Sequence, residues 1–298
     1  QDLSVDLDDL RRLRREVCGK GFKGAAGTSA SYHQLLEGTD IDTLGFEELA
    51  MKALDLPAMA VATQTYARKQ DYRVLTGLAS LGQSLYKFAA DIRLLQSPPL
   101  GEFAEPFGAK QVGSSAMPFK RNPIDCENID SVTRLLATLP RVAWDNAAHS
   151  YLERTLDDSA NRRTILPEGF LIADHALDRA RKVITGLRID LSAAQRLMDV
   201  YGRFAATERL MMELAKAGAD RQATHEVIRT HSLAAWHAIR IGQENPLVGL
   251  LSGDPELQKY ASAEKIAGWL DATGYVGDAP RRARMLANTI RAQLADND

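Results

Sequence analysis

A heptad repeat between Asp71 and Gln96 restricts the possible fold more than any other feature of this chain. Its apolar side chains alternate steps of four and three residues, at Val74, Leu78, Leu81, Leu85, Phe88, Ile92 and Leu95. With the less regular stretch before it, this spacing predicts one long helix that ends at Pro98 and Pro99. Such a seam favours nearly parallel packing against other helices, in a bundle or an oligomer core.

Helical patterns continue on both sides of this repeat, and no run of residues alternates as a strand would. An apolar stripe near the N-terminus has no cap before it, as if the chain started inside a helix: Leu3, Leu7, Leu10, Leu13 and Val17. Further on, Asn122 as N-cap, Pro123 at the first helical position and Asp125 in the first turn predict another helix start. We expect this helix to run to about residue 150, with a bend near Pro140.

A third long helix should begin at Asp158 and Ser159 and continue past Ile184. Beyond it, shorter amphipathic helices are separated by glycines, at Gly202, Gly218, Gly242 and the 274–277 region. We place a domain boundary near Asp190. The sequence thus predicts an all-α fold, with a long-helix bundle over residues 1–190 and a smaller helical domain over 191–298.

Composition excludes several classes of partner. Thirty-seven basic residues stand against 39 acidic ones, a net charge of -2, so no global field attracts nucleic acid or an anionic membrane. No apolar run approaches the roughly 20 residues that span a bilayer. The two cysteines, Cys18 and Cys126, fit neither a disulfide framework nor a metal-ligand spacing, which suits a reducing cytoplasm.

Residues 101–121 lack a helical period and are predicted to form a long loop, a class that is usually functional or disordered. Its second half reads Gly-Ser-Ser-Ala-Met-Pro-Phe-Lys-Arg-Asn-Pro over residues 113–123. Backbone N–H groups and the helix dipole after Asn122, with the charge of Lys120, favour a bound carboxylate or oxyanion. The alternative interpretation is a solvated Ser/Gly linker before a capped helix.

This stretch resembles the signature Gly-Ser-Ser-x-Met-Pro-x-Lys-x-Asn-Pro of the fumarase, aspartase, argininosuccinate lyase and adenylosuccinate lyase superfamily. The resemblance implies that Ser114 is the base that removes a Cβ proton from a succinyl group. It also implies that Lys120 and Asn122 hold the adjacent carboxylate as it gains charge, with Ser115 and Met117 against the substrate. A serine needs nearby cations and N–H donors, with water excluded, to act as a base.

The superfamily resemblance extends to Glu127, which falls where members place an acid that orients a catalytic histidine. The alternative interpretation of Glu127 is an ordinary acidic residue in the first turn of a helix. This chemistry needs only side chains, so we expect no metal and no organic cofactor. Members are homotetramers whose active sites combine residues from three subunits, and the heptad seam gives this chain a physical reason to associate in the same way.

A second motif reads Glu-Arg-Thr-Leu-Asp-Asp-Ser-Ala-Asn-Arg-Arg over residues 153–163. It places the Ser159 hydroxyl at a helix start, with Arg154 and Arg163 on either side, which suits a phosphate. The alternative is ordinary surface pairing of both arginines with the aspartates at 157 and 158.

The second motif resembles adenylosuccinate lyases of the animal type, which implies that Arg154, Ser159 and Arg163 bind substrate and its phosphate. Further matches keep order and approximate spacing, at residues 23–28, 64–66, 91–95 and 206–208. The resemblance implies that Gln64 is a substrate-binding glutamine. Without the resemblance, the pattern favours a residue on a helix surface. The implied activity is fumarate elimination from adenylosuccinate, giving AMP, and from SAICAR, giving AICAR, in purine biosynthesis.

Some positions depart from the animal-type pattern, with Ser29 in place of Gln and Asn128 in place of Arg, which leaves their contact with substrate open. Members also carry the general-acid histidine in a Thr-His segment that would precede the helix at which this chain begins. None of the six histidines occupies a Thr-His-x-Gln-Pro context: His33, His149, His175, His225, His231 and His237. We therefore expect the chain to match the C-terminal three fifths of the enzyme and to be inactive alone.

Three other interpretations remain at this point. The first is a carboxymuconate cycloisomerase, whose loop can also carry Lys-Arg-Asn-Pro, although the arginines of the second motif argue against it. The second is a helix-turn-helix over residues 217–237 that contacts DNA, which the acidic balance disfavours. The third is a non-catalytic, oligomerising helical scaffold.

Overall fold

The computed structural model describes residues 1–108, 117 and 119–295, which divide into two compact units. The first unit comprises residues 1–96 and 103–188, and the second comprises residues 97–102 and the chain from 189 onward. Nearly every regular element of the described ranges is helical. Two-residue strands, β1 (Phe103–Ala104) and β2 (Arg188–Ile189), form one short pair. The all-α prediction is confirmed.

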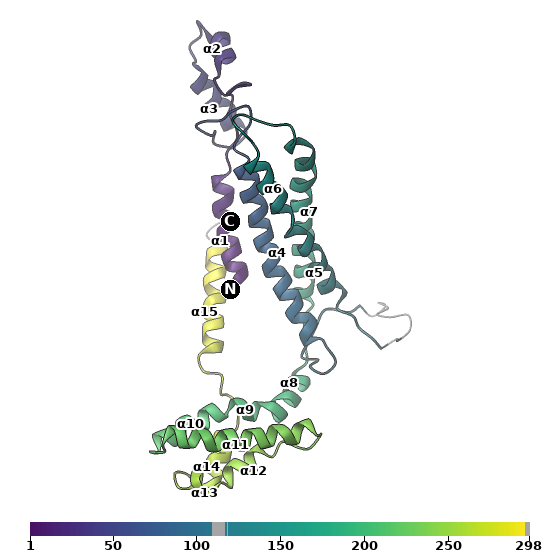
Figure 1. The fold of residues 1–298 in the computed structure, drawn as a ribbon, viewed down its shortest axis with the longest axis vertical. Helices are drawn as coiled ribbons and strands as arrows, with labels where there is room; N and C mark the ends of the chain where they lie inside the picture. Colours follow the sequence, from purple (N-terminus) through teal and green to yellow (C-terminus); the bar gives the residue numbers. More distant parts are fainter. Residues whose placement is uncertain (109–116, 118, 296–298) are drawn as a thin grey trace. The chain divides into compact units, whose positions relative to one another are not determined.

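A bundle of long helices forms most of the first unit (Figure 1). Its helices are α1 (Asp2–Glu16), α2 (Ala30–Leu36), α3 (Thr43–Ala53), α4 (Lys69–Leu95), α5 (Ile124–Leu136), α6 (Leu139–Ala148) and α7 (Asp158–Thr185). Helix α4 is the centre of the bundle and packs against α1, α5, α6 and α7. Its 27 residues make a rod about 40 Å long.

The heptad repeat predicted α4 correctly, although the buried face shifts along the helix. Four of its seam positions are buried, at Leu78, Leu81, Leu85 and Ile92, whereas Leu75 and Ala89 are buried in place of their neighbours Val74 and Phe88. A helix with 3.6 residues per turn drifts about 20° per heptad against a strict seven-residue repeat, which accounts for this exchange. The helix does not include the stretch before Lys69, so that part of the prediction is wrong.

Ion pairs fix the relative directions of the bundle helices. Arg162, near the start of α7, pairs with Asp71 at the start of α4. Asp130 of α5 pairs with Arg93 at the end of α4. Helices α4 and α7 therefore run parallel, and α5, which begins near the end of α4, runs antiparallel to both.

The predicted helix from residue 122 to about 150 is two helices. Helix α5 stops at Leu136, and α6 starts at Leu139 with Pro140 in its first turn. Proline lacks an N–H and its ring clashes with the carbonyl four residues earlier, so the break falls directly before it. The start is also one residue later than predicted, because Pro123 rather than Asn122 occupies the N-cap position.

The second unit is built from shorter helices: α8 (Leu191–Leu197), the π-helix η1 (Met198–Gly202), α9 (Arg203–Ala205), α10 (Thr207–Lys216), α11 (Arg221–Arg240), α12 (Leu247–Ser252), α13 (Pro255–Gln258), α14 (Ala263–Trp269) and α15 (Ala279–Ala295). Its core is aliphatic and includes Leu210, Leu214, Leu247, Leu251, Ile266 and Leu270. Gly218 and Gly242 follow helix ends at φ of 93° and 80°, where glycine is favoured. The expectation that Gly202 separates two helices is wrong, since η1 continues into α9.

Across the described ranges, no helix is both long enough and apolar enough to cross a membrane.

Candidate functional site

The residues predicted after the signature serines lie at the start of α5. Lys120 and Glu127 are exposed, the latter on the first turn of the helix, and Asn122 is half-buried. The Lys120 N–H donates to the Met117 carbonyl, at 2.9 Å. Ser114 and Ser115 lie outside the described residues.

Glu105 occupies the N-terminus of α5. Its carboxylate is buried, with 2% exposure, and accepts the N–H groups of Asp125, at 3.2 and 3.1 Å, and of Cys126, at 3.1 Å. A buried carboxylate needs such donors, and a helix N-terminus supplies them with a favourable dipole. The N–H groups of Asp125 and Cys126 are therefore occupied by a carboxylate of the same chain and are not available to a substrate anion. The binding of such an anion by Lys120 and Asn122 stays a prediction.

Gln96, at the end of α4, links residues 105 and 121, which lie toward the two ends of the loop predicted over residues 101–121. Its side-chain oxygen accepts the Glu105 N–H at 2.9 Å, and its side-chain nitrogen donates to the Arg121 carbonyl at 3.0 Å. One amide thus holds residues 105 and 121 together beside the N-terminus of α5. Sequence reasoning missed this link, because the amide lies outside the motif.

Polar contacts between α5 and α7 surround this end of the bundle. Asp125 is buried and accepts hydrogen bonds from Arg179 and from Lys182, the latter at 2.6 Å. Burial alone would raise the pKa of Asp125, but the hydrogen bonds from Lys182 and Arg179 outweigh it and the pKa lies below its ordinary value. Asn128 contacts a ring nitrogen of His175 at 2.7 Å, so its side chain already has a partner in the same chain.

The residues of the second motif lie at the opposite end of the bundle. Ser159 is half-buried in the first turn of α7, and Arg163, one turn further on, is exposed. Spaced by four residues, the two share one face of the helix. Arg154 is half-buried, and its Nε donates to the Thr155 carbonyl at 3.2 Å.

Gln64 belongs to the same end. It is exposed and lies in the irregular segment before α4, so the reading of it as a helix-surface residue is wrong. The Thr63 hydroxyl donates to the Glu153 carbonyl at 2.8 Å, which brings the segments that carry Gln64 and Arg154 side by side. A groove of about 320 Å³ lies between these segments, lined by residues 61–63, 65–69, 147 and 150–153.

The alternative reading of the second motif as surface ion pairs is also wrong. Asp158 is buried and pairs with Arg68, at 2.6 Å, rather than with Arg154 or Arg163. Throughout the described part of the chain, neither of those two arginines forms an ion pair with a carboxylate. Their guanidinium groups are thus available for an anionic ligand.

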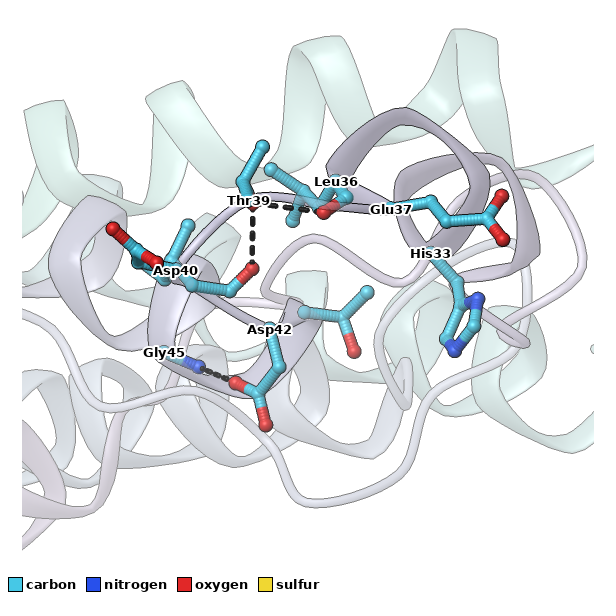
Figure 2. A pocket seen from close by; sticks show the side chains of 9 residues that line it. His33, Leu36, Glu37, Thr39, Asp40, Asp42 and Gly45 are labelled. Carbon is cyan, nitrogen blue, oxygen red and sulfur yellow. Dashed lines mark hydrogen bonds between the residues drawn. The ribbon is translucent and has the colours of Figure 1, made fainter.

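A larger cavity, of about 510 Å³, lies in the hairpin of α2 and α3 and contains none of the predicted site residues (Figure 2). Its walls include His33, Glu37 and Asp42. Asp42 caps α3 by accepting the Gly45 N–H at 2.8 Å, and the Thr39 hydroxyl donates to the Leu36 carbonyl at 2.8 Å. These polar groups serve the local turn. In the part of the chain that is described, no group of three or more His, Cys, Asp or Glu side chains could hold a metal ion.

The start of α5 and the start of α7, which carry described residues of the two predicted groups, are far apart within one chain. The start of α5 lies beside Arg179 and Lys182 of α7. Ser159 is 20 residues before Arg179 on the same helix, which at 1.5 Å per residue is about 30 Å. Among the described residues, a metabolite at the start of α5 therefore cannot also contact Ser159 in the same chain.

Comparison with known proteins identifies the family of this chain. A family model described as "Lyase" matches residues 1–135, and one described as "Adenylosuccinate lyase C-terminus" matches residues 204–285. The structure of 3-carboxy-cis,cis-muconate lactonizing enzyme from Pseudomonas putida superposes with a TM-score of 0.77 at 22% identity, over 93% of this chain and 58% of that one. That likeness is one of fold. The bundle and these matches place the chain in the fumarate lyase superfamily.

Sequence relatives define the family more narrowly. Adenylosuccinate lyase of Schizosaccharomyces pombe is 38% identical over 97% of this chain and 59% of its own length. That of Schistosoma mansoni is 35% identical over 97% of this chain and 60% of its own length. The chain belongs to the adenylosuccinate lyase family, and it spans about three fifths of the length of these relatives.

Proposed function

We propose that this protein is a carbon–nitrogen lyase of the amidine-lyase type that eliminates fumarate from adenylosuccinate, giving AMP, and from SAICAR, giving AICAR. Support comes chiefly from the second motif, near the start of α7. There Ser159 offers a hydroxyl, and Arg154 and Arg163 offer two guanidinium groups that form no ion pair with a carboxylate of the described residues. That set suits a phosphate monoester, which both substrates carry. The similarity to adenylosuccinate lyases along almost the whole chain supports the same choice.

The proposed chemistry begins at the signature segment. Ser114, as an alkoxide, takes the Cβ proton of the succinyl group. The electron pair moves into the adjacent carboxylate, which Lys120 and Asn122 hold as it gains charge, with Ser115 and Met117 against the substrate. The double bond of fumarate then forms as the C–N bond breaks.

The nitrogen that leaves must gain a proton, and Glu127 would orient the histidine that donates it. We assign none of the six histidines of this chain to that role, so we expect the 298-residue chain alone to associate without turnover. Side chains supply every group in this scheme, and it calls for no cofactor. Two free cysteines are compatible with a cytoplasmic location.

The separation of the two groups supports a shared active site. Arg179 of α7, which pairs with Asp125, lies about 30 Å from Ser159 along the helix. The signature segment of one subunit would therefore meet the arginine motif of another. We therefore propose a homotetramer in which each substrate contacts more than one subunit. The partners of the protein are then its own copies and small-molecule substrates, without nucleic acid or membrane.

The test is fumarate release from adenylosuccinate and from SAICAR by the full-length protein, with sedimentation to establish the tetramer. We expect release from both substrates, and we expect Ser114→Ala to abolish it in a tetramer of unchanged size. A folded tetramer that releases fumarate from neither substrate would show that the assignment is wrong. Turnover of a carboxymuconate instead would favour the cycloisomerase reading.

A further inference from the structure

Five side chains form a buried charge cluster at the end of the bundle where the arginine motif lies: Tyr66, Arg68, Asp71, Asp158 and Arg162. Arg68 Nε donates to Asp158 Oδ2 at 2.6 Å, and Arg162 Nε donates to Asp71 Oδ2 at 2.6 Å. The Tyr66 hydroxyl donates to Asp71 Oδ1 at 2.6 Å and accepts from Arg162 Nη2 at 2.5 Å. The cluster ties the segment before α4 to the first turns of α4 and α7.

The charges of the cluster balance, two guanidinium groups against two carboxylates. Arg68, Asp71 and Asp158 are all buried, with 6%, 4% and 4% exposure. Both guanidinium groups also lie over the Tyr66 ring, 4.7 and 5.5 Å from its centroid. Removing one partner from such a group leaves an uncompensated charge in a poorly solvated place.

Residues of the buried charge cluster alternate along the chain with the proposed substrate contacts. Ser159 follows Asp158, Arg163 follows Arg162, and Gln64 precedes Tyr66 by two residues. Neighbouring side chains on a helix point about 100° apart. Because Asp158 is buried and Arg162 pairs with Asp71 of α4, the rotation of α7 is fixed with Ser159 and Arg163 turned away from these contacts.

Asp158 presents an electrostatic problem for a phosphate site. It carries a negative charge beside Ser159, and its Oδ1 is buried with no hydrogen-bond partner among the described residues. The compensating charges are Arg68, at 2.6 Å, and Arg162, at 3.9 Å. Without Arg68, much of the Asp158 charge would act on any anion bound at Ser159, because Asp158 is buried, with 4% exposure, and solvent screens a buried charge weakly.

We propose that Arg68 is a positioning residue for phosphate binding, which both orients the start of α7 and cancels the charge of Asp158 next to the bound phosphate. This inference rests on the proposed function, since it takes the ligand of Ser159 and Arg163 to be a nucleoside monophosphate group. Arg68 and Arg162 pair with the buried aspartates, whereas Arg154 and Arg163 would contact the ligand.

The two halves of one ion pair give the test. In the full-length protein, Arg68→Gln should weaken AMP binding and raise KM for adenylosuccinate by about tenfold, with kcat little changed, because an uncancelled carboxylate repels the phosphate. Asp158→Asn should leave AMP affinity unchanged or tighter, and the double variant should return it toward the wild-type value. A purely structural role predicts that both single variants weaken binding.

Succinyladenosine, which is adenylosuccinate without the phosphate, provides a second readout, since its KM should respond little to Arg68→Gln. Arg229→Gln, which breaks an exposed pair with Glu226, is the matched control and should change neither affinity. If Arg68→Gln does not fold, Arg68→Lys takes its place. Because the lysine keeps a positive charge beside Asp158, we expect this variant to bind AMP with near wild-type affinity, as we expect for Asp158→Asn.

Equal weakening of AMP binding by the Arg68 and Asp158 variants would overturn the inference, as would wild-type AMP affinity in a folded Arg68→Gln protein. Calorimetry with AMP measures this without turnover. A wild-type protein that binds AMP but releases no fumarate would therefore refute the proposed function and leave the inference to be decided by the same titrations.

Discussion

Replacement of Glu105 tests whether its buried carboxylate holds the N-terminus of α5. Glu105→Gln keeps the shape but loses the charge, and with it the charge-assisted bonds to the N–H groups of Asp125 and Cys126. Hydrogen bonds to a charged group contribute about 1.5 to 3 kcal/mol, so we expect a loss of about 2 kcal/mol in the free energy of unfolding. Glu105→Ala leaves both buried donors without a partner, and we expect a loss of about 4 kcal/mol.

The assay is urea unfolding of each variant at one fixed protein concentration, because the proposed association of subunits would add to the measured stability. Glu168→Gln, on an exposed position of α7, is the control and should unfold with the wild type. The reasoning predicts stability in the order wild type, Glu105→Gln, Glu105→Ala. Equal midpoints for all four proteins would refute the capping role of Glu105.

Two further predictions concern the same end of the bundle. Because the pKa of Asp125 is lowered in the folded protein, its contribution to stability is present above the ordinary pKa of 3.8 and is lost as the pH falls through the folded-state pKa. Asp125→Asn should therefore lower the free energy of unfolding at pH 7 and reduce the difference in that free energy between pH 7 and pH 3, measured by urea unfolding. An unchanged difference would contradict the ion pairs with Arg179 and Lys182. Burial, reinforced by the charge of Glu105, raises the pKa of the Cys126 thiol. A thiol reagent should therefore modify Cys18 alone in the native protein and both cysteines in urea. Rapid reaction of Cys126 in the native protein would contradict its burial.

The parts of the fold that follow from local spacing could be predicted from the sequence. The heptad repeat located α4, and the Asp158–Ser159 start signal located α7, because helix periodicity and end signals are properties of adjacent residues. The break between α5 and α6 was predicted only as a bend. A proline can kink or end a helix, and tertiary packing decides which.

The contacts that organise the candidate site could not be predicted, because they join residues far apart in the chain. Glu105 caps a helix that begins 19 residues later, and nothing in a solvated-looking Glu-Pro pair indicates burial. In the second motif, spacing cannot decide which of Arg162 and Arg163 faces the bundle. That choice depends on Asp71 and Tyr66, more than 90 residues earlier.

The most direct test of the account is complementation between two inactive variants. Ser114 and Arg163 of one chain would belong to different active sites, so coexpressed full-length Ser114→Ala and Arg163→Met proteins should form mixed tetramers that release fumarate. We expect about one quarter of the wild-type rate, because each site draws its two side chains independently from two subunits. Mixed tetramers with no activity would contradict the shared site, and with it the proposed arrangement of the substrate across subunits.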